Sequence, residues 1–115
     1  MAAAKKPEAS VKAAAGLKAL YRTYRDQFPE IADTIATFNE YKREIPPRQL
    51  PQKMKDHVLD GPLKGIRECH LDDDVLLLYT HKKNEVRMLF ICEHADLYGR
   101  RGRQVAKRVK ALLED

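Results

Sequence analysis

The fold is decided by residues 66–92, which read IRECHLDDDVLLLYTHKKNEVRMLFIC. Three segments of this stretch have the β-branched and aliphatic composition of β-strands: Ile66–Leu71, Val75–Thr80 and Glu85–Cys92. Short polar connections at Asp72–Asp73 and Lys82–Asn84 separate them. Because connections this short join only antiparallel neighbours, the stretch predicts a three-stranded antiparallel meander.

Apolar residues at helical spacing precede the meander. The first stripe predicts an amphipathic helix over residues 8–27, with Gly16 as a weak point, and consists of Leu17, Leu20, Tyr21, Tyr24 and Phe28. The second stripe begins after Pro29, must stop at Pro46–Pro47, and consists of Ile31, Ile35, Phe38 and Ile45. We therefore expect two helices arranged as a hairpin, followed by an irregular connection rich in Pro and Gly over residues 46–65.

A last helix is predicted over residues 103–113, where one apolar stripe contains Val105, Val109, Leu112 and Leu113. At 115 residues the chain is expected to be a single α+β domain, residues 1–115. In this fold class an N-terminal helical hairpin packs on a small antiparallel β-sheet, and a basic helical extension, residues 100–115, ends the chain. Residues 1–8 are expected to be flexible.

Composition narrows the class of protein. No apolar run approaches the roughly 20 residues of a membrane span, and no apolar segment follows the N-terminal charges as in a secretory signal. We therefore expect a cytoplasmic protein without a membrane partner. Cys69 and Cys92 both fall on predicted strands, which favours buried, reduced thiols over a disulfide framework or a zinc site.

The net charge of +5 is concentrated near the C-terminus. Six basic residues follow one another there without an intervening acid: Arg100, Arg101, Arg103, Lys107, Arg108 and Lys110. Such a basic stripe is typical of a protein with a phosphate-rich partner, although a solvated helix face would have the same composition. Charge alone does not identify the nucleic acid.

The meander should bring three ionisable residues together. The first strand ends where the second begins, and the third ends beside the same point, so His70, Asp74 and His94 are expected at one end of the sheet. His81 follows the second strand at the opposite end and serves as an internal control. The simpler interpretation is that each histidine is a surface residue and the Asp72–Asp74 run only forms a turn. Convergence of all three favours a site.

Clustered imidazoles suit the cleavage of RNA by its own 2′-hydroxyl, because this reaction needs a base, an acid and stabilisation of the phosphorane at neutral pH. No metal or other cofactor is required. Two weaker alternatives remain: a metal site formed by His70, Asp74 and His94, and a nucleophilic pair formed by Cys92 and His94.

The sequence also resembles a known family over residues 55–99. The matching positions are Lys55-Asp56-His57, Leu59, Gly61, Lys64-Gly65, Arg67, His70, Asp74, Leu76, Leu78-Tyr79, His94-Ala95, Leu97 and Gly99. Together they resemble bacterial toxins of the RelE superfamily, specifically the YafQ-like mRNA interferases. The resemblance implies a RelE-like α+β fold, cleavage of mRNA in the ribosomal A site with contacts to ribosomal RNA, and neutralisation by a cognate antitoxin protein.

Carried over by position, the resemblance implies a catalytic set of His57, His70, Asp74 and His94. His94 would be the main proton-transfer group and acid, His57 the complementary acid or base, and the other two would orient the nucleotide or tune the imidazoles. Residues expected to bind RNA are Lys64, Arg67, Tyr98, Arg100, Arg101 and Arg103.

The chain departs from the family pattern at three places. Val75 replaces the Trp that often follows the family's aspartate, no strand is evident before the first helix, and a basic helix continues past Gly99.

Two other functions compete with the nuclease. One is a non-catalytic RelE/ParE-like binding module acting on a protein partner such as DNA gyrase, which would have no use for converging histidines. The other is a free-standing basic RNA-binding protein, which leaves the same residues unexplained.

Overall fold

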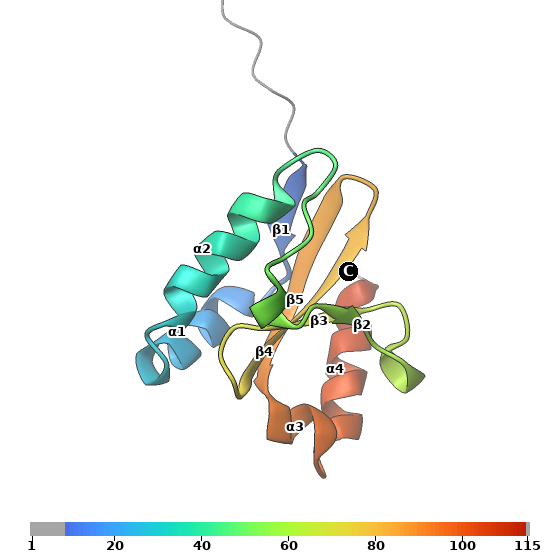
Figure 1. Ribbon diagram of the computed structural model, residues 1–115. Helices are drawn as coiled ribbons and strands as arrows, with labels where there is room; N and C mark the ends of the chain where they lie inside the picture. The colour runs from blue at the N-terminus through green and yellow to red at the C-terminus, as the bar shows by residue number, and fades with distance from the viewer. Residues whose placement is uncertain (1–8, 115) are drawn as a thin grey trace, which may run out of the picture.

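The computed structural model describes residues 9–114 (Figure 1). The expected flexibility of residues 1–8 therefore falls outside the described residues. In chain order the elements are β1 (Ser10–Ala13), α1 (Leu17–Gln27), α2 (Ile31–Lys42), the 3-10 turn η1 (Gln52–Met54), β2 (His57–Val58), the 3-10 turn η2 (Gly61–Leu63), β3 (Arg67–His70), β4 (Val75–Lys82), β5 (Glu85–Glu93), α3 (His94–Tyr98) and α4 (Gly102–Leu113).

One five-stranded sheet has the order β1-β5-β4-β3-β2. The pairs β2–β3, β3–β4 and β4–β5 are antiparallel, so the predicted meander of β3, β4 and β5 is confirmed. His70 pairs with Leu76, and Val75 pairs with Glu93. This register places the end of β3, the start of β4 and the end of β5 at the same end of the sheet.

The predictions for residues 9–16 are wrong. Ser10–Ala13 forms β1, which adds to the sheet parallel to β5, and the chain does have a strand before its first helix. The Ser10 N–H donates to the Asn84 carbonyl at 2.8 Å, so pairing with the free edge of β5 overrides the helical propensity of the Ala-rich start. Gly16 then has a φ of 84°, a left-handed conformation that glycine adopts readily, and α1 begins only after it.

Two other elements are absent from the sequence prediction. β2 lies in the connection predicted to be irregular, and α3 lies between the last predicted strand and the last predicted helix. With two and five residues, both are too short to give a periodic pattern.

Alternating side chains of β4 build a separate core on each face of the sheet. Leu77 and Tyr79 lie in the core that contains Ile31 and Phe38 of α2, whereas Leu76 and Leu78 lie in the core covered by α4. The α4 residues of the second core are Val105, Ala106 and Val109. Figure 1 shows the consequence, with α1 and α2 on one side of the sheet and α4 on the other.

The chain turns from α3 into α4 through two glycines that have no room for a side chain. A Cβ atom on Gly99 would collide with the carbonyl oxygen of Ala95, and one on Gly102 with that of Leu97. This close approach lets α4 fold back over the sheet. None of the helices within residues 9–114 is long and apolar enough to cross a lipid bilayer.

The position of α4 predicts that it contributes to the stability of the whole domain. Val109 is fully buried, so Val109→Ala should lower the free energy of unfolding by about 1.5–3 kcal/mol through lost burial and the cavity left behind. Urea denaturation followed by circular dichroism measures this change. Lys110→Ala, on the exposed face of the same helix, should change it by less than about 0.5 kcal/mol. Equal effects of the two variants would show that α4 does not pack as described.

Candidate functional site

A buried carboxylate is the centre of the candidate site. Glu68 lies in the middle of β3 and is 1% exposed. The Tyr98 hydroxyl, carried by α3, donates a hydrogen bond to Glu68 Oε2 at 2.6 Å. Burial of a charged group is costly unless it is paired or hydrogen-bonded, so the surroundings of Glu68 must supply partners.

The register of the sheet brings two histidines to the same carboxylate. His57 on β2 lies directly opposite Glu68, and His70 lies two residues further along β3, so all three side chains project from one face. Glu68 Oε1 lies 3.7 Å from His57 Nε2 and 3.8 Å from His70 Nε2. One carboxylate thus faces two imidazoles and a phenol.

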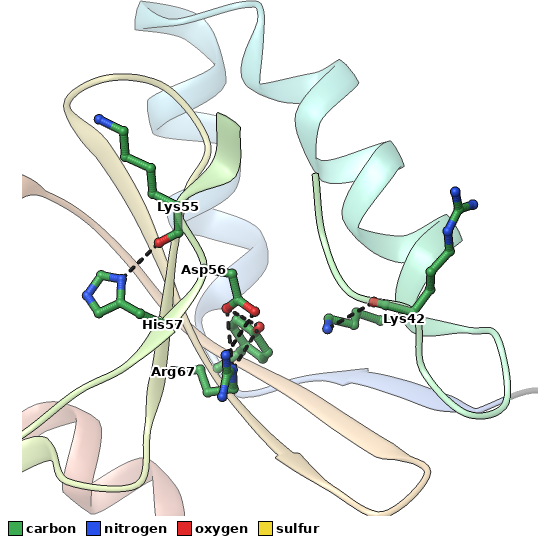
Figure 2. A network of polar contacts seen from close by, with 7 residues as sticks. Lys42, Lys55, Asp56, His57 and Arg67 are labelled. Atoms are coloured by element: carbon green, nitrogen blue, oxygen red, sulfur yellow. Dashed lines mark hydrogen bonds and ion pairs between the residues drawn. The ribbon is translucent and has the colours of Figure 1, made fainter. Parts of the chain in front are cut away.

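A backbone carbonyl fixes the protonation of one His57 nitrogen. His57 Nδ1 lies 2.8 Å from the carbonyl oxygen of Lys55, as Figure 2 shows. Because a carbonyl oxygen only accepts hydrogen bonds, Nδ1 must carry a proton. Nε2, on the side of Glu68, is then the nitrogen at which His57 gains or loses a proton.

His94 belongs to the same end of the sheet, as the meander predicted. It is the first residue of α3, and its ring lies against that of Tyr98 with 4.5 Å between the centroids. Its backbone N–H donates to the carbonyl of Asp74 at 2.8 Å, which places these two residues side by side. His81 lies at the far end of the sheet, paired with Val86, also as predicted.

The ionisation of Tyr98 and Cys92 limits the chemistry available. Burial, and then the hydrogen bond to Glu68, raise the pKa of Tyr98, so this residue is a neutral donor. Burial raises the pKa of the Cys92 thiol to about 12. A thiol that stays protonated at neutral pH is a poor nucleophile. The burial of Cys92 therefore gives no support to a nucleophilic Cys92–His94 pair.

A second polar network anchors β2 from the other face of the sheet. Arg67 Nη2 lies 3.0 Å from Asp56 Oδ2, and the Tyr79 hydroxyl donates to Asp56 Oδ1. Figure 2 shows this cluster next to His57. Hydrogen bonding to Asp56 raises the pKa of Arg67, and burial raises that of Tyr79. Because Asp56 immediately precedes His57, the network holds the short strand that carries the histidine.

Lys42, at the end of α2, also contacts this network through the ring of Tyr79. It is 3% exposed, its Nζ donates to the Arg48 carbonyl at 3.2 Å, and it lies over the Tyr79 ring at 5.8 Å from the centroid. Burial lowers the pKa of Lys42.

The residues expected to bind RNA differ in their surroundings. The Arg67 side chain is 34% exposed and already holds Asp56, so its contact with RNA remains a prediction beside an evident structural role. Lys64, Arg100, Arg101 and Arg103 are exposed, and Tyr98 is 53% exposed. Among residues 9–114, no group of three His, Cys, Asp or Glu side chains is arranged to hold a metal ion.

Sequence reasoning missed Glu68, Asp56, Tyr79 and Lys42 as parts of a site. The sequence does contain one indication for Glu68. It lies on a predicted strand two positions before His70, so the two side chains should project from the same face of the sheet. The other three join the network only through tertiary contacts.

A family model matches most of this chain, and two curated relatives match shorter parts of it. A family model described as "Bacterial toxin of type II toxin-antitoxin system, YafQ" matches residues 11–99, so α4 lies outside the match. The "mRNA interferase toxin YafQ" of Escherichia coli K12 is 38% identical over 50 residues, which are 44% of this chain and 54% of the relative. The "Putative toxin YafQ" of Haemophilus influenzae is 44% identical over 32 residues, 28% of this chain and 31% of the relative.

The fold is also found among solved structures. The E. coli DinJ-YafQ complex contains a chain that aligns with a TM-score of 0.61 at 21% identity, covering 78% of this chain and 98% of that one. An alignment at this identity shows a common fold. The aligned sequences of the two curated relatives, in turn, cover about a third and about half of their lengths.

The network around Asp56 predicts unequal costs for removing its members. Asp56→Ala should lower the free energy of unfolding by about 2–3 kcal/mol. This is less than the loss expected on breaking a fully buried ion pair, because the Arg67 side chain is 34% exposed to solvent. Tyr79→Phe keeps the ring in the core and should cost only about 1–2 kcal/mol. Urea denaturation of both variants tests the order. A larger loss in Tyr79→Phe would contradict the central role of Asp56.

Raised pKa values predict a loss of stability in alkali. Burial raises the pKa of Cys92 from 9.0 to about 12 and that of Tyr24 from 10.0 to about 12. Above the ordinary values the unfolded chain loses protons that the folded chain keeps, so stability must fall as pH rises toward 12. The urea midpoint should therefore decrease from about pH 9 upward, and less steeply in Tyr24→Phe. A midpoint that is constant across this range would contradict the burial of these groups.

Proposed function

The chain belongs to the YafQ family of toxins of type II toxin–antitoxin systems, and we propose that it is an endoribonuclease that cleaves mRNA in the ribosomal A site. The observation that supports this proposal best is the buried Glu68 carboxylate, which gathers His57, His70 and Tyr98 at the end of the sheet that carries His94.

The proposed reaction is an attack of the RNA 2′-hydroxyl on the adjacent phosphorus. A base removes the 2′ proton, the 2′ oxygen forms a bond to phosphorus, and the bond to the 5′ oxygen breaks as an acid protonates that oxygen. The products are a 2′,3′-cyclic phosphate and a 5′-hydroxyl. Every step is a proton transfer or a displacement, so imidazoles are sufficient and no metal takes part.

The geometry suggests a division of roles. His57 Nε2 can exchange a proton because Nδ1 is already committed to the Lys55 carbonyl, which suits the base. His94 is exposed and rests on the Tyr98 ring, which suits the acid that meets the departing oxygen. Glu68 is a positioning residue that holds His57 and His70, while His70 and Asp74 orient the nucleotide.

Basic residues would hold the RNA. Lys64, Arg100, Arg101 and Arg103 are exposed, and we assign them contacts to mRNA and ribosomal RNA. Arg67 would contribute its charge while holding Asp56. Such a substrate places the protein in the cytoplasm with the ribosomes.

A cognate antitoxin is the proposed protein partner. The E. coli relative was crystallised with DinJ, and a toxin of a type II system is paired with an antitoxin. Nothing in these comparisons supports the module directed at DNA gyrase. A free-standing RNA-binding protein would leave the grouping of His57 and His70 on one buried carboxylate without a purpose.

His94 and His81 lie at opposite ends of the sheet, so we expect their substitution to affect RNA cleavage differently. His94→Ala should reduce single-turnover cleavage about 10²–10⁴-fold while the protein stays folded, because the reaction loses a proton-transfer group. His81→Ala, at the opposite end, should leave the rate within about twofold. New mRNA 5′ ends in a translating extract measure cleavage. Equal losses in both folded variants would show that the site lies elsewhere.

The basic residues after α3 predict a salt dependence. Each neutralised phosphate contributes a slope of about 0.7–0.9 in log affinity against log salt, so replacing Arg100, Arg101 and Arg103 by Ala should flatten the slope by about two to three. The rate at saturating ribosome should change little. Ribosome binding measured at several salt concentrations gives the slope. An unchanged affinity and slope would mean that these residues are only a solvated face.

A further inference from the structure

A mostly apolar pocket lies beside the proposed catalytic site and shares Tyr98 with it. It has a volume of about 320 Å³ and lies between the β2–η2 segment and the α3–α4 turn. This volume is at the lower end of the range for small-molecule pockets, about 300–1,000 Å³. The pocket is large enough for one flat ring system and too small for a helix.

Buried core residues form part of the pocket wall. Leu59 and Leu63 line it from the β2–η2 segment and Ala106 from α4, and all three are buried members of the core on that face of the sheet. Gly102 also lines it, where a larger residue would collide with the Leu97 carbonyl. The pocket is therefore preformed by core packing.

Tyr98 connects the pocket to the catalytic residues. Its ring lines the pocket and is half-exposed, while its hydroxyl is held on Glu68 and one side of the ring lies against His94. A ring fixed in this way is a surface on which a base can stack. A base in the pocket would lie next to the histidines that act on its backbone.

Two charged residues supply polar recognition. Asp60 and Arg103 both line the pocket, one acidic and one basic, and both are exposed. Guanine alone among the RNA bases offers two adjacent donors, N1–H and N2–H, for a carboxylate and two adjacent acceptors, O6 and N7, for a guanidinium. Adenine and cytosine offer the carboxylate only one exocyclic amino group.

We propose that this pocket binds a guanine base of the RNA within one nucleotide of the bond that is cut. The proposal rests on the proposed endoribonuclease function and adds its base preference. Arg103, Gly102 and Ala106 come from α4, outside the residues that match the family model. This chain's preference would then depend on residues that the family pattern does not contain.

The first test maps cut sites by sequencing 5′ ends after addition of the protein to a translating extract. Wild-type cuts should show guanine enriched at one position next to the cut. Asp60→Asn and Arg103→Met should each reduce that enrichment about tenfold, because each removes one bidentate contact. Lys110→Met removes the same charge from α4 without touching the pocket and should leave the preference unchanged.

The outcomes separate the two proposals. Cleavage without guanine enrichment, or enrichment that survives both pocket substitutions, overturns the guanine pocket and leaves the nuclease intact. Absence of cleavage overturns the nuclease, and nucleotide binding then decides the pocket. In that second test, binding of GMP or AMP is followed by NMR through the backbone amide resonances of Leu63 and Gly99. GMP should bind at least about fivefold more tightly than AMP. Equal affinities for the two nucleotides overturn the pocket.

Discussion

The site depends on the requirement that a carboxylate removed from water must find partners. Glu68 is almost completely buried in the middle of a sheet, and the partners within reach come from three different elements: His57 from β2, His70 from its own strand and Tyr98 from α3. Leaving such a group unpaired would cost several kcal/mol in a domain whose total stability is about 5–15 kcal/mol. The same contacts that stabilise Glu68 therefore fix the relative positions of the groups proposed to act on RNA.

Neighbouring residues of β3 hold β2 from both faces of the sheet. Arg67 and Glu68 point in opposite directions because side chains alternate along a strand. Arg67 holds Asp56, and Glu68 faces His57, the next residue of the chain. A two-residue strand has little stability of its own, so this double attachment explains how His57 can be positioned by a segment with so little regular structure.

The sequence predicts the elements that have long patterns and misses those that depend on tertiary contacts. The meander, and with it the grouping of His70, Asp74 and His94 at one end, follows from strand composition and short connections. β1 could not be predicted, because the Ala-rich start favours a helix until the free edge of β5 is available for pairing. The place of His57 came from a family resemblance, since nothing local indicates β2. Glu68 was missed because a single charged residue in a strand is ordinarily solvated, and only the register shows that it is buried.

The most direct test of the Glu68 arrangement is a double-mutant cycle on single-turnover RNA cleavage with Glu68→Gln, Tyr98→Phe and the two combined. If Glu68 and Tyr98 act as one unit, the double variant should be no more than about threefold slower than the slower single variant, because the second substitution removes an interaction already lost. Rate losses that multiply in the double variant would contradict the arrangement, and would mean that the two residues act independently.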